Sequence, residues 1–340
     1  MKTNWGTYLE QEIDLYTLEN AFLRVEISNF GGVIRSLFVK AFDRDVVLGF
    51  CDLADYIADD KYVGCLIGRH ANRIENGKFT LNAKAYQLNL NNPPNHLHGG
   101  FTGFNKRVFD CVEETSDSLT LHYLSAHNEE NYPGNLDFTV SYTFDEDTLI
   151  LRYSGLSDKR TLFNPTHHSY FNLSGEPTIG NHELSIDADR FAPLNTFGLG
   201  LYPPHKTVGA MDFNRFAQLS SRLNADIETI RIARGLDHHF QRKCDTDKPF
   251  IRLRHGLRNL SVITDAQGAQ VYSGNYLDGK ISGKDGFVND RQSGICFETQ
   301  FYPNSINNEV KIKSVLEAFE PKEFTTQFRF YLKEETRHDK

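Results

Sequence analysis

"LDFTVSYTFDEDTLILRY", residues 136–153, alternates apolar and polar side chains on both sides of an acidic turn. Every second residue from Leu136 to Phe144 is apolar, and the same alternation returns from Leu149 to Tyr153. Side chains of a β-strand point alternately to the two faces of a sheet, so each half predicts a strand with one buried face. Two such runs joined by the short turn 145–148 predict an antiparallel hairpin.

The same period of two recurs along the chain, in residues 22–28, 118–124 and 327–332. Helical spacing is scarce, and only residues 52–60 and 215–227 predict short helices. Strands do not alternate with helices, which argues against a parallel doubly wound sheet. No linker or fixed-period repeat interrupts the pattern. The sequence therefore predicts an all-β protein, with residues 1–340 forming one large antiparallel sandwich or barrel-like domain.

The composition limits the class of protein and its partners. Hydrophobic residues make up 39% and charged residues 24%, as in soluble globular proteins. A net charge of −8 without any basic run argues against a nucleic-acid partner. No apolar run approaches the ~20 residues of a membrane helix, and the first residues lack a secretory signal. The five cysteines are widely spaced without a C-x-x-C pair, so we expect a reducing cytoplasm and no disulfide framework.

The stretch "GICFETQ", residues 294–300, offers a carboxylate on a predicted strand. Alternation puts Ile295 and Phe297 on one face and Glu298 on the other, with Cys296 and Gln300. If that second face lines a pocket, loss of water raises the pKa of the carboxyl toward the range of a general base. On this strand alone, an exposed glutamate without a chemical role is an equally good interpretation.

Histidines raise the question of a metal site. In "NHLHGG", residues 95–100, His96 and His98 can point to the same side of an extended chain. A metal site of the H-x-H type requires a carboxylate a few residues further on, and the following segment "GGFTGFNK" contains none. There is no H-E-x-x-H, and the paired histidines of "THHS" and "DHHF" point to opposite sides of an extended chain. A metal site is disfavoured, as is nucleophilic hydrolysis, because G-x-S-x-G is absent.

Six segments in series resemble the galactose mutarotase (aldose 1-epimerase) family, in order and in approximate spacing, over nearly the whole chain. They are GRHANRIENGKF (68–79), LHGG (97–100), NPTHHSYFNL (164–173), GLDHHF (235–240), VYSGNYLDG (271–279) and CFETQ (296–300). The resemblance implies a large β-sandwich that uses neither a metal nor an organic cofactor. It also implies interconversion of the α and β anomers of free aldohexoses, typically galactose and glucose.

The resemblance implies roles for particular residues of this chain. Glu298 corresponds to the catalytic base, His168 to the general acid, and His98 to a residue that assists at the ring oxygen. The positions that correspond to residues holding the sugar hydroxyls are Asn72, Arg73, Asp237 and Gln270. Tyr132, in a "YPG" segment that often has glycine where this chain has Asn131, is a further expected pocket residue, since Asn tolerates left-handed backbone angles. The histidines that receive no role are His70, His96, His167 and His238.

Two rival functions remain open at this stage. An epimerase for phosphorylated hexoses would need a cationic phosphate site, and neither Arg69 nor Lys106 belongs to an obvious basic cluster. A catalytically silent sugar-binding module would be expected to lack Glu298 or His168, and both are present. The sequence leaves open the preferred sugar, the acceptance of disaccharides, and the choice between monomer and homodimer.

Overall fold

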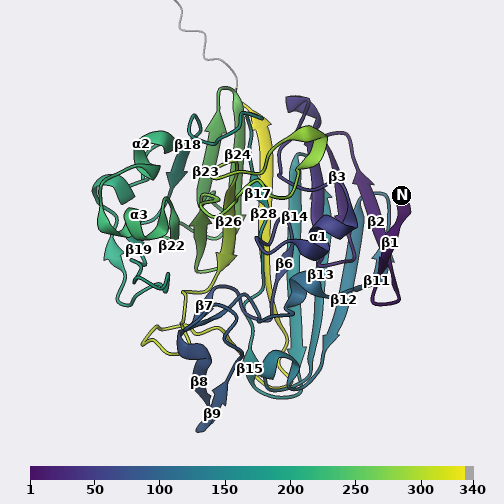
Figure 1. Cartoon of the computed structure of the whole chain (residues 1–340), viewed down its shortest axis with the longest axis vertical. Coiled ribbons are helices and arrows are strands. Elements are labelled where there is room, and N and C mark those ends of the chain that lie inside the picture. Colours follow the sequence, from purple (N-terminus) through teal and green to yellow (C-terminus); the bar gives the residue numbers. More distant parts are fainter. Residues whose placement is uncertain (334–340) are drawn as a thin grey trace, which may run out of the picture.

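The computed structural model describes residues 1–333, and antiparallel β-sheet dominates its regular structure (Figure 1). The longest sheet has nine strands, and all of their pairings are antiparallel. In spatial order its strands are β11 (Asp110–Glu114), β12 (Ser118–Ser125), β13 (Leu136–Asp145), β14 (Thr148–Ser157), β28 (Lys322–Leu332), β24 (Arg258–Thr264), β23 (Ile251–His255), β18 (Glu183–Ile186) and β21 (Ala217–Gln218).

Two smaller antiparallel sheets pack against this long sheet. One has the spatial order β17 (Tyr170–Phe171), β26 (Ile295–Gln300), β25 (Gly268–Tyr272), β22 (Asp237–Gln241), β19 (Arg190–Phe191) and β20 (His205–Lys206). The other runs from β1 (Lys2–Tyr8) through β2 (Gln11–Glu19), β3 (Leu23–Ser28) and β4 (Ile34–Val39) to β5 (Arg44–Asp45). Figure 1 shows β22 to the left and β1 to β3 to the right of the long central strands.

Aromatic side chains fill the space between these layers. The ring of Phe171 on β17 lies 5.0 Å from that of Phe328 on β28, and Phe42, after β4, lies 6.4 Å from Phe330. Both smaller sheets thus share one apolar core with the long sheet. This is a β-sandwich, which confirms the predicted fold class.

The predicted hairpin is present as β13 and β14, paired from Leu136 with Ser157 to Asp145 with Thr148. The predicted helices are shorter than expected, α1 (Leu53–Ala58) and α2 (Leu219–Leu223), and α3 (Glu228–Ala233) was not predicted. Helices of about six residues complete fewer than two turns, so their periodicity is weak in a sequence.

The remaining elements are short strands and 3₁₀ turns between the longer strands. The strands are β6 (Leu66–Ile67), β7 (Arg73–Ile74), β8 (Lys78–Leu81), β9 (Lys84–Gln87), β10 (His96–Leu97), β15 (Thr161–Leu162), β16 (Thr166–His167) and β27 (Val315–Leu316). The 3₁₀ turns are η1 (Lys40–Phe42), η2 (Glu75–Gly77), η3 (Phe104–Lys106), η4 (Glu129–Asn131), η5 (Gly209–Met211) and η6 (Lys284–Gly286).

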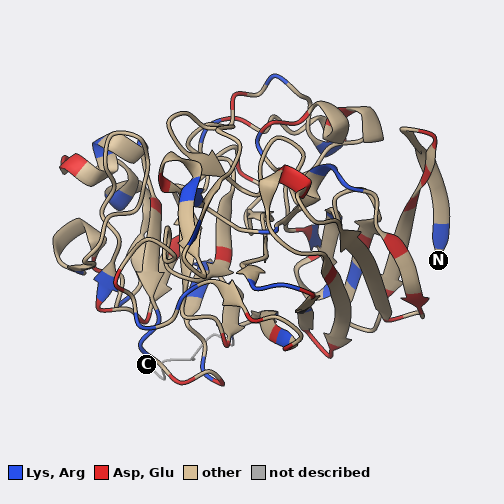
Figure 2. Cartoon of the chain, turned by 90° about the horizontal axis from the view of Figure 1, so that it is seen from below, with Lys and Arg blue, Asp and Glu red and all other residues tan. Residues whose placement is uncertain are grey.

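The surface carries charges of both signs. Figure 2 shows acidic and basic residues interspersed over all the sheets. Such a mixture gives a weak field for attracting a polyanion. Within residues 1–333, each helix is too short or too polar to cross a lipid bilayer.

Candidate active site

One face of the six-stranded sheet gathers the polar side chains that the sequence singled out. Gln270 on β25 stands opposite Glu298 on β26, and Asp237 on β22 stands opposite Tyr272, two residues along β25. Because alternate strand residues share a face, these four side chains point to the same side of the sheet. They line a pocket of about 490 Å³.

Ile295 and Phe297 point to the opposite side of β26 and belong to the core between the sheets. The structure therefore confirms the two faces predicted for this strand. Glu298 lies on the pocket face and is not an exposed strand residue.

His98 enters the pocket from the loop after β10. Its Nδ1 accepts a hydrogen bond from the backbone N–H of Asn72, at 3.2 Å, so the neutral ring carries its proton on Nε2. Gly99 follows with φ of +89°, and a Cβ there would lie 1.7 Å from the carbonyl oxygen of Gly68. Only glycine fits this approach, which explains the first glycine of "LHGG".

His168, which follows β16, reaches the pocket beside Glu298. Its Nε2 lies 3.7 Å from Oε1 of Glu298, and its Nδ1 lies 3.5 Å from Sγ of Cys296. The rings of His98 and His168 meet edge to face at 5.6 Å. The three expected catalytic residues are thus brought together from three separate parts of the chain.

Burial decides the protonation of this cluster. Glu298 is 2% exposed and His168 is 3% exposed. Loss of water raises the pKa of Glu298 well above its ordinary value, and the nearby Asp237 raises it further, while Arg73 opposes both. The same loss of water lowers the pKa of His168 to about 3, and that of His98 well below its usual range. Both shifts favour uncharged side chains.

One carboxylate oxygen of the cluster remains available. Oε2 of Glu298 is buried and makes no hydrogen bond to any residue of the described chain. A buried oxygen without a partner costs free energy, so a ligand hydroxyl that donates to it is favoured.

The expected sugar-holding residues form the pocket wall next to this cluster. Arg73 donates from Nε to Oδ1 of Asn92 at 3.0 Å, and Gln270 donates from Nε2 to Oδ1 of Asp237 at 2.7 Å. Asn72 also lines the pocket. Burial raises the pKa of Asp237, against the influence of Arg73 and Gln270. These contacts fix the side chains and leave further donors and acceptors for a polyhydroxylated ligand.

Tyr132 does not line the pocket, which corrects the expectation from the sequence. It is buried in a separate apolar cluster, where its hydroxyl donates to Nε2 of His96 at 2.7 Å. Asn131 before it has the left-handed backbone expected at this position, with φ of 69°. His96 uses its other ring nitrogen on the carbonyl of Asn89, at 2.8 Å, and is a structural residue.

The other histidines without an expected role also lie outside this pocket, and each has a polar partner. His70 contacts the hydroxyl of Ser314, His167 contacts Ser169 and the carbonyl oxygen of Gly32, and His238 contacts Thr229.

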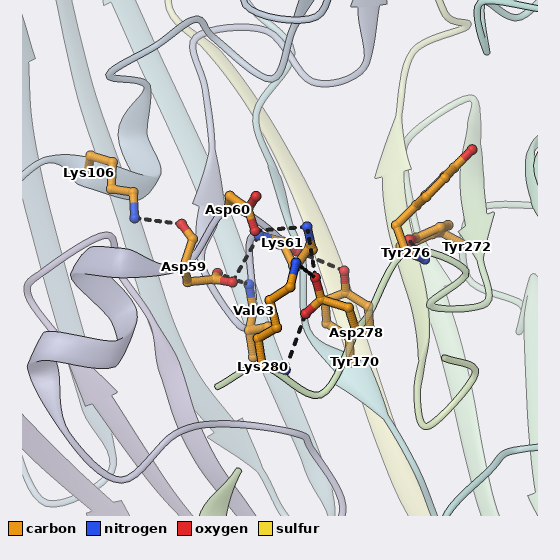
Figure 3. A network of polar contacts seen from close by, with 10 residues as sticks. All are labelled: Asp59, Asp60, Lys61, Val63, Lys106, Tyr170, Tyr272, Tyr276, Asp278 and Lys280. Carbon is orange, nitrogen blue, oxygen red and sulfur yellow. Dashed lines mark hydrogen bonds and ion pairs between the residues drawn. The ribbon is translucent and has the colours of Figure 1, made fainter. Parts of the chain in front are cut away.

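Tyr62 is a pocket residue that the sequence did not reveal. Its ring lies 4.8 Å from that of His98 and 5.8 Å from that of His168, and its φ is +60°. The carboxylate of Asp59 accepts the backbone N–H groups of Lys61 and Val63 and so builds the turn (Figure 3). The sequence feature that could have revealed this turn is Asp59, two residues before Lys61, because Asp favours such turns.

Charges at the mouth of the pocket are paired. Nζ of Lys61 lies 2.9 Å from a carboxylate oxygen of Asp60 and 3.9 Å from one of Asp278 (Figure 3). Asp278 also pairs with Lys280 at 2.7 Å. Lys61, which lines the pocket, is therefore paired with two acids, and it shares Asp278 with Lys280.

The cluster has a second chemical possibility besides proton transfer. One ligand atom from each of His98, His168 and Glu298 lies within 4.8 Å of the other two. Two imidazoles and a carboxylate can hold a metal ion. The structure places such a set here, whereas the H-x-H pattern considered from the sequence would have used His96.

A larger cavity of about 720 Å³ lies beside β3, β4 and η6. Two of its acids pair with cations there, Glu26 with Arg35 and Asp45 with Lys284. No histidine is found among the described residues that line it. The smaller pocket is therefore the better site for acid–base chemistry.

The pocket brings together two imidazoles and a carboxyl, groups that can exchange protons with a small polar ligand, and comparison with known proteins specifies the family. Residues 14–329 match the sequence profile of the aldose 1-epimerase family. The galactose mutarotases of Mus musculus and Homo sapiens are each 38% identical over 330 residues, covering 94% of this chain and 94% of theirs. The crystal structure of the galactose 1-epimerase from Lactobacillus acidophilus has a TM-score of 0.88 at 27% identity, covering 98% of this chain and 99% of that one. The chain belongs to the aldose 1-epimerase family.

Proposed function

We propose that this protein interconverts the α and β anomers of free aldohexoses such as galactose and glucose. The observation that carries the proposal is the 3.7 Å separation of His168 Nε2 and Glu298 Oε1 inside a polar pocket. The relatives named galactose mutarotase and aldose 1-epimerase, which match nearly the whole chain, support it.

Mutarotation is a problem of proton transfer. A proton leaves the C1 hydroxyl while another reaches the ring oxygen, and the ring opens. The C1–C2 bond rotates, and closure on the other face of the carbonyl reverses both transfers. Each catalyst serves as an acid in one direction and as a base in the other, which suits histidine and a carboxyl with a raised pKa.

The geometry supports a division of these roles. Glu298 acts as the base at the C1 hydroxyl, because its Oε2 has no other partner in the described chain. His168 acts as the acid at the ring oxygen, and His98 assists by donating from Nε2, the nitrogen left free by Asn72. Each positioned proton transfer contributes roughly 10²–10⁴-fold to the rate.

The sugar has to stay bound while C1 turns. Arg73 and Asp237 supply several donors and acceptors on one wall, which suits neighbouring hydroxyls. Asn72 and Gln270 complete this set in the proposal. No step of this scheme requires a metal or an organic cofactor.

The rival functions are weaker on this structure. A phosphorylated hexose needs a cluster of cations for its phosphate, and the described residues that line the pocket include only two cations, Lys61 and Arg73. Lys61 pairs with Asp60 and Asp278, and the charge of Arg73 acts on Asp237 and Glu298. Burying charged and polar groups costs free energy, so a binding module without catalytic activity would not be expected to keep a buried glutamate beside a buried histidine.

The proposal extends to the domain organisation, the compartment and the partners of the protein. We infer that residues 1–340 act as one domain, supported by the core that runs from β2 to β28. All five cysteines lie in the described chain as free thiols, which supports a reducing cytoplasm. We expect a monomer or a homodimer, with a small sugar as the partner and neither nucleic acid nor membrane.

Polarimetry tests the activity directly. Freshly dissolved α-galactose and α-glucose should reach their equilibrium rotation faster with the protein than in buffer alone. An unchanged rate for both sugars, with folded protein, would refute the proposed function.

A further inference from the structure

We propose that the larger cavity, of about 720 Å³ beside β3, β4 and η6, binds a small phosphorylated polyhydroxy compound. Arg44 and Lys284 hold the phosphate group of this ligand, and acids at the rim accept its hydroxyls. Among the described residues that line this cavity, none also lines the catalytic pocket. The inference therefore goes beyond the proposed function and does not depend on it.

The floor of the cavity is the outer face of the five-stranded sheet. Arg24 on β3, Phe38 on β4 and Asp45 on β5 pair in one row across three strands, and Glu26 pairs with Ser36 on β3 and β4. All five border the cavity. The apolar residues that alternate with them along β3 and β4 belong to the core. Strand alternation thus gives this outer face its charged and polar side chains.

The amine of Lys284 lies deep in the cavity. Its Nζ is 2.6 Å from Oδ2 of Asp45, and its side chain is only 11% exposed. Loss of water lowers the pKa of Lys284, although the carboxylate of Asp45 opposes this shift. The surroundings therefore compensate the positive charge incompletely, and an anion in the cavity would be stabilised beside it.

Arginine donors at the cavity lack partners. Nε of Arg44 and Nε of Arg35 are buried and have no hydrogen-bond partner within residues 1–333. Arg35 pairs with Glu26 through Nη1, whereas no carboxylate of these residues pairs with Arg44. A buried donor without an acceptor costs free energy, so a ligand oxygen beside it is favoured. The planar fork of a guanidinium matches two oxygens of a phosphate group.

Two glycines leave space for these cations. A Cβ at Gly175, where φ is +71°, would lie 1.9 Å from Nη1 of Arg44. A Cβ at Gly49 would lie 3.1 Å from Cε of Lys284 and 2.6 Å from the carbonyl oxygen of Arg35. Both cations are thus packed closely against the backbone at the cavity. Groups that are ordered before a ligand arrives lower the entropy cost of binding.

The acids at the rim indicate which kind of anion fits. Asp43 and Asp285 border the cavity and are exposed. They repel a bare anion, but a carboxylate accepts hydrogen bonds from hydroxyls. Oδ1 of Asn289 is a further acceptor, buried without a partner within residues 1–333. Cations inside and acceptors at the rim match a molecule with an anionic end and a hydroxylated end.

Charge and size favour a phosphate ester for this ligand. A phosphate monoester carries a charge of about −1.5 to −2 near pH 7, which suits two cations better than the single charge of a carboxylate. The volume of about 720 Å³ falls in the ~300–1,000 Å³ range of small-molecule pockets and leaves space for the hydroxylated part.

Isothermal titration calorimetry with glycerol 3-phosphate tests the site. The wild type should bind this probe more tightly than inorganic phosphate, which lacks the hydroxyls, and more tightly than glycerate, which has a carboxylate instead. Arg44→Gln should weaken binding by roughly tenfold or more, the effect of a lost charge-assisted hydrogen bond. Arg215→Gln is the matched control, because Arg215 is exposed and lies outside the cavity, and it should bind like the wild type.

Two further measurements separate this site from the catalytic pocket. Saturating galactose should leave the affinity for glycerol 3-phosphate unchanged, and Arg44→Gln should leave the mutarotation rate unchanged. Thermal unfolding checks that the variant is folded, and the comparisons with the wild type alone need no variant.

Three outcomes would overturn the proposal. They are a wild type that does not bind glycerol 3-phosphate, equal binding by the wild type and folded Arg44→Gln, and displacement of the probe by galactose. Failure of the proposed function looks different, since binding of glycerol 3-phosphate would then persist in a protein that converts no sugar.

Discussion

Nε2 of His168 lies 3.7 Å from Oε1 of Glu298, although both side chains are almost fully buried. Burial favours the uncharged form of each, with the proton on the carboxyl and a neutral imidazole. Transfer of this one proton from Glu298 to His168 would create the base and the acid of ring opening together. Sugar hydroxyls that donate to the carboxylate would favour that transfer.

The first prediction concerns these two residues. Glu298→Gln and His168→Asn should each lower kcat for galactose by roughly 10²-fold or more, the effect of losing a proton-transfer catalyst. Both substitutions keep the approximate shape of the side chain. Initial rates of optical rotation on freshly dissolved α-galactose measure the effect.

His122→Asn is the matched control, because His122 lies at the surface and pairs with Asp137. It should leave kcat unchanged. His98→Asn should lower kcat, whereas His96→Asn should change the kcat of the folded protein little. Equal losses at positions 96 and 98 would show that the functional histidine of "NHLHGG" is assigned incorrectly.

The second prediction concerns pH. The pair needs its one proton, which Glu298 holds before the transfer to His168, so kcat/KM should fall as the pH rises through the raised pKa of Glu298. That alkaline limb should lie above the pKa of about 4.3 of an ordinary glutamate. Arg73 lowers this pKa, so Arg73→Gln should move the limb to higher pH. An alkaline limb that Arg73→Gln leaves unmoved would contradict the assignment of Glu298.

Much of the fold could be predicted from the sequence because its long strands have one buried face. The alternation in residues 136–153 placed β13 and β14 and their turn correctly. Strands of two residues, such as β7, β10 and β16, cannot show a period of two. These short strands nevertheless carry Arg73 and the loops of His98 and His168 into the pocket.

The site was predictable only in part. Strand alternation put Glu298 on a different face from Phe297, but it could not show that this face lines a pocket. Tyr62 reaches the histidines through a left-handed turn, which a local pattern does not place in space. Tyr132 was expected in the pocket from its place in the sequence, but it lies outside, and its hydroxyl bonds to His96. The sequence could not reveal this contact.

The third prediction concerns metal. Prolonged dialysis against EDTA should leave the mutarotation rate unchanged if protons alone do the work. Added Zn²⁺ should inhibit, because His98, His168 and Glu298 can surround it and would lose the lone pairs that accept protons. Activity lost to EDTA and restored by Zn²⁺ would establish a metal-dependent mechanism instead.

The fourth prediction concerns Tyr132. Tyr132→Phe should lower the free energy of unfolding by about 1–3 kcal/mol, because buried Nε2 of His96 loses its hydrogen-bond donor. KM for galactose should not change, since Tyr132 lies outside the pocket. Urea unfolding and polarimetry measure the two quantities. A raised KM with unchanged stability would restore Tyr132 as a sugar-binding residue.

The fifth prediction concerns the C1 hydroxyl of the sugar. Methyl β-galactoside keeps every other hydroxyl but has no proton to give to Glu298, so ring opening cannot begin. It should still contact Arg73 and Asp237, which do not need that proton, and should therefore inhibit galactose conversion weakly and competitively. Its own optical rotation should stay constant with the protein present. Conversion of the glycoside to its α anomer, or release of methanol, would mean that the enzyme cleaves the glycosidic bond, and the role of Glu298 as the base of ring opening would then be wrong.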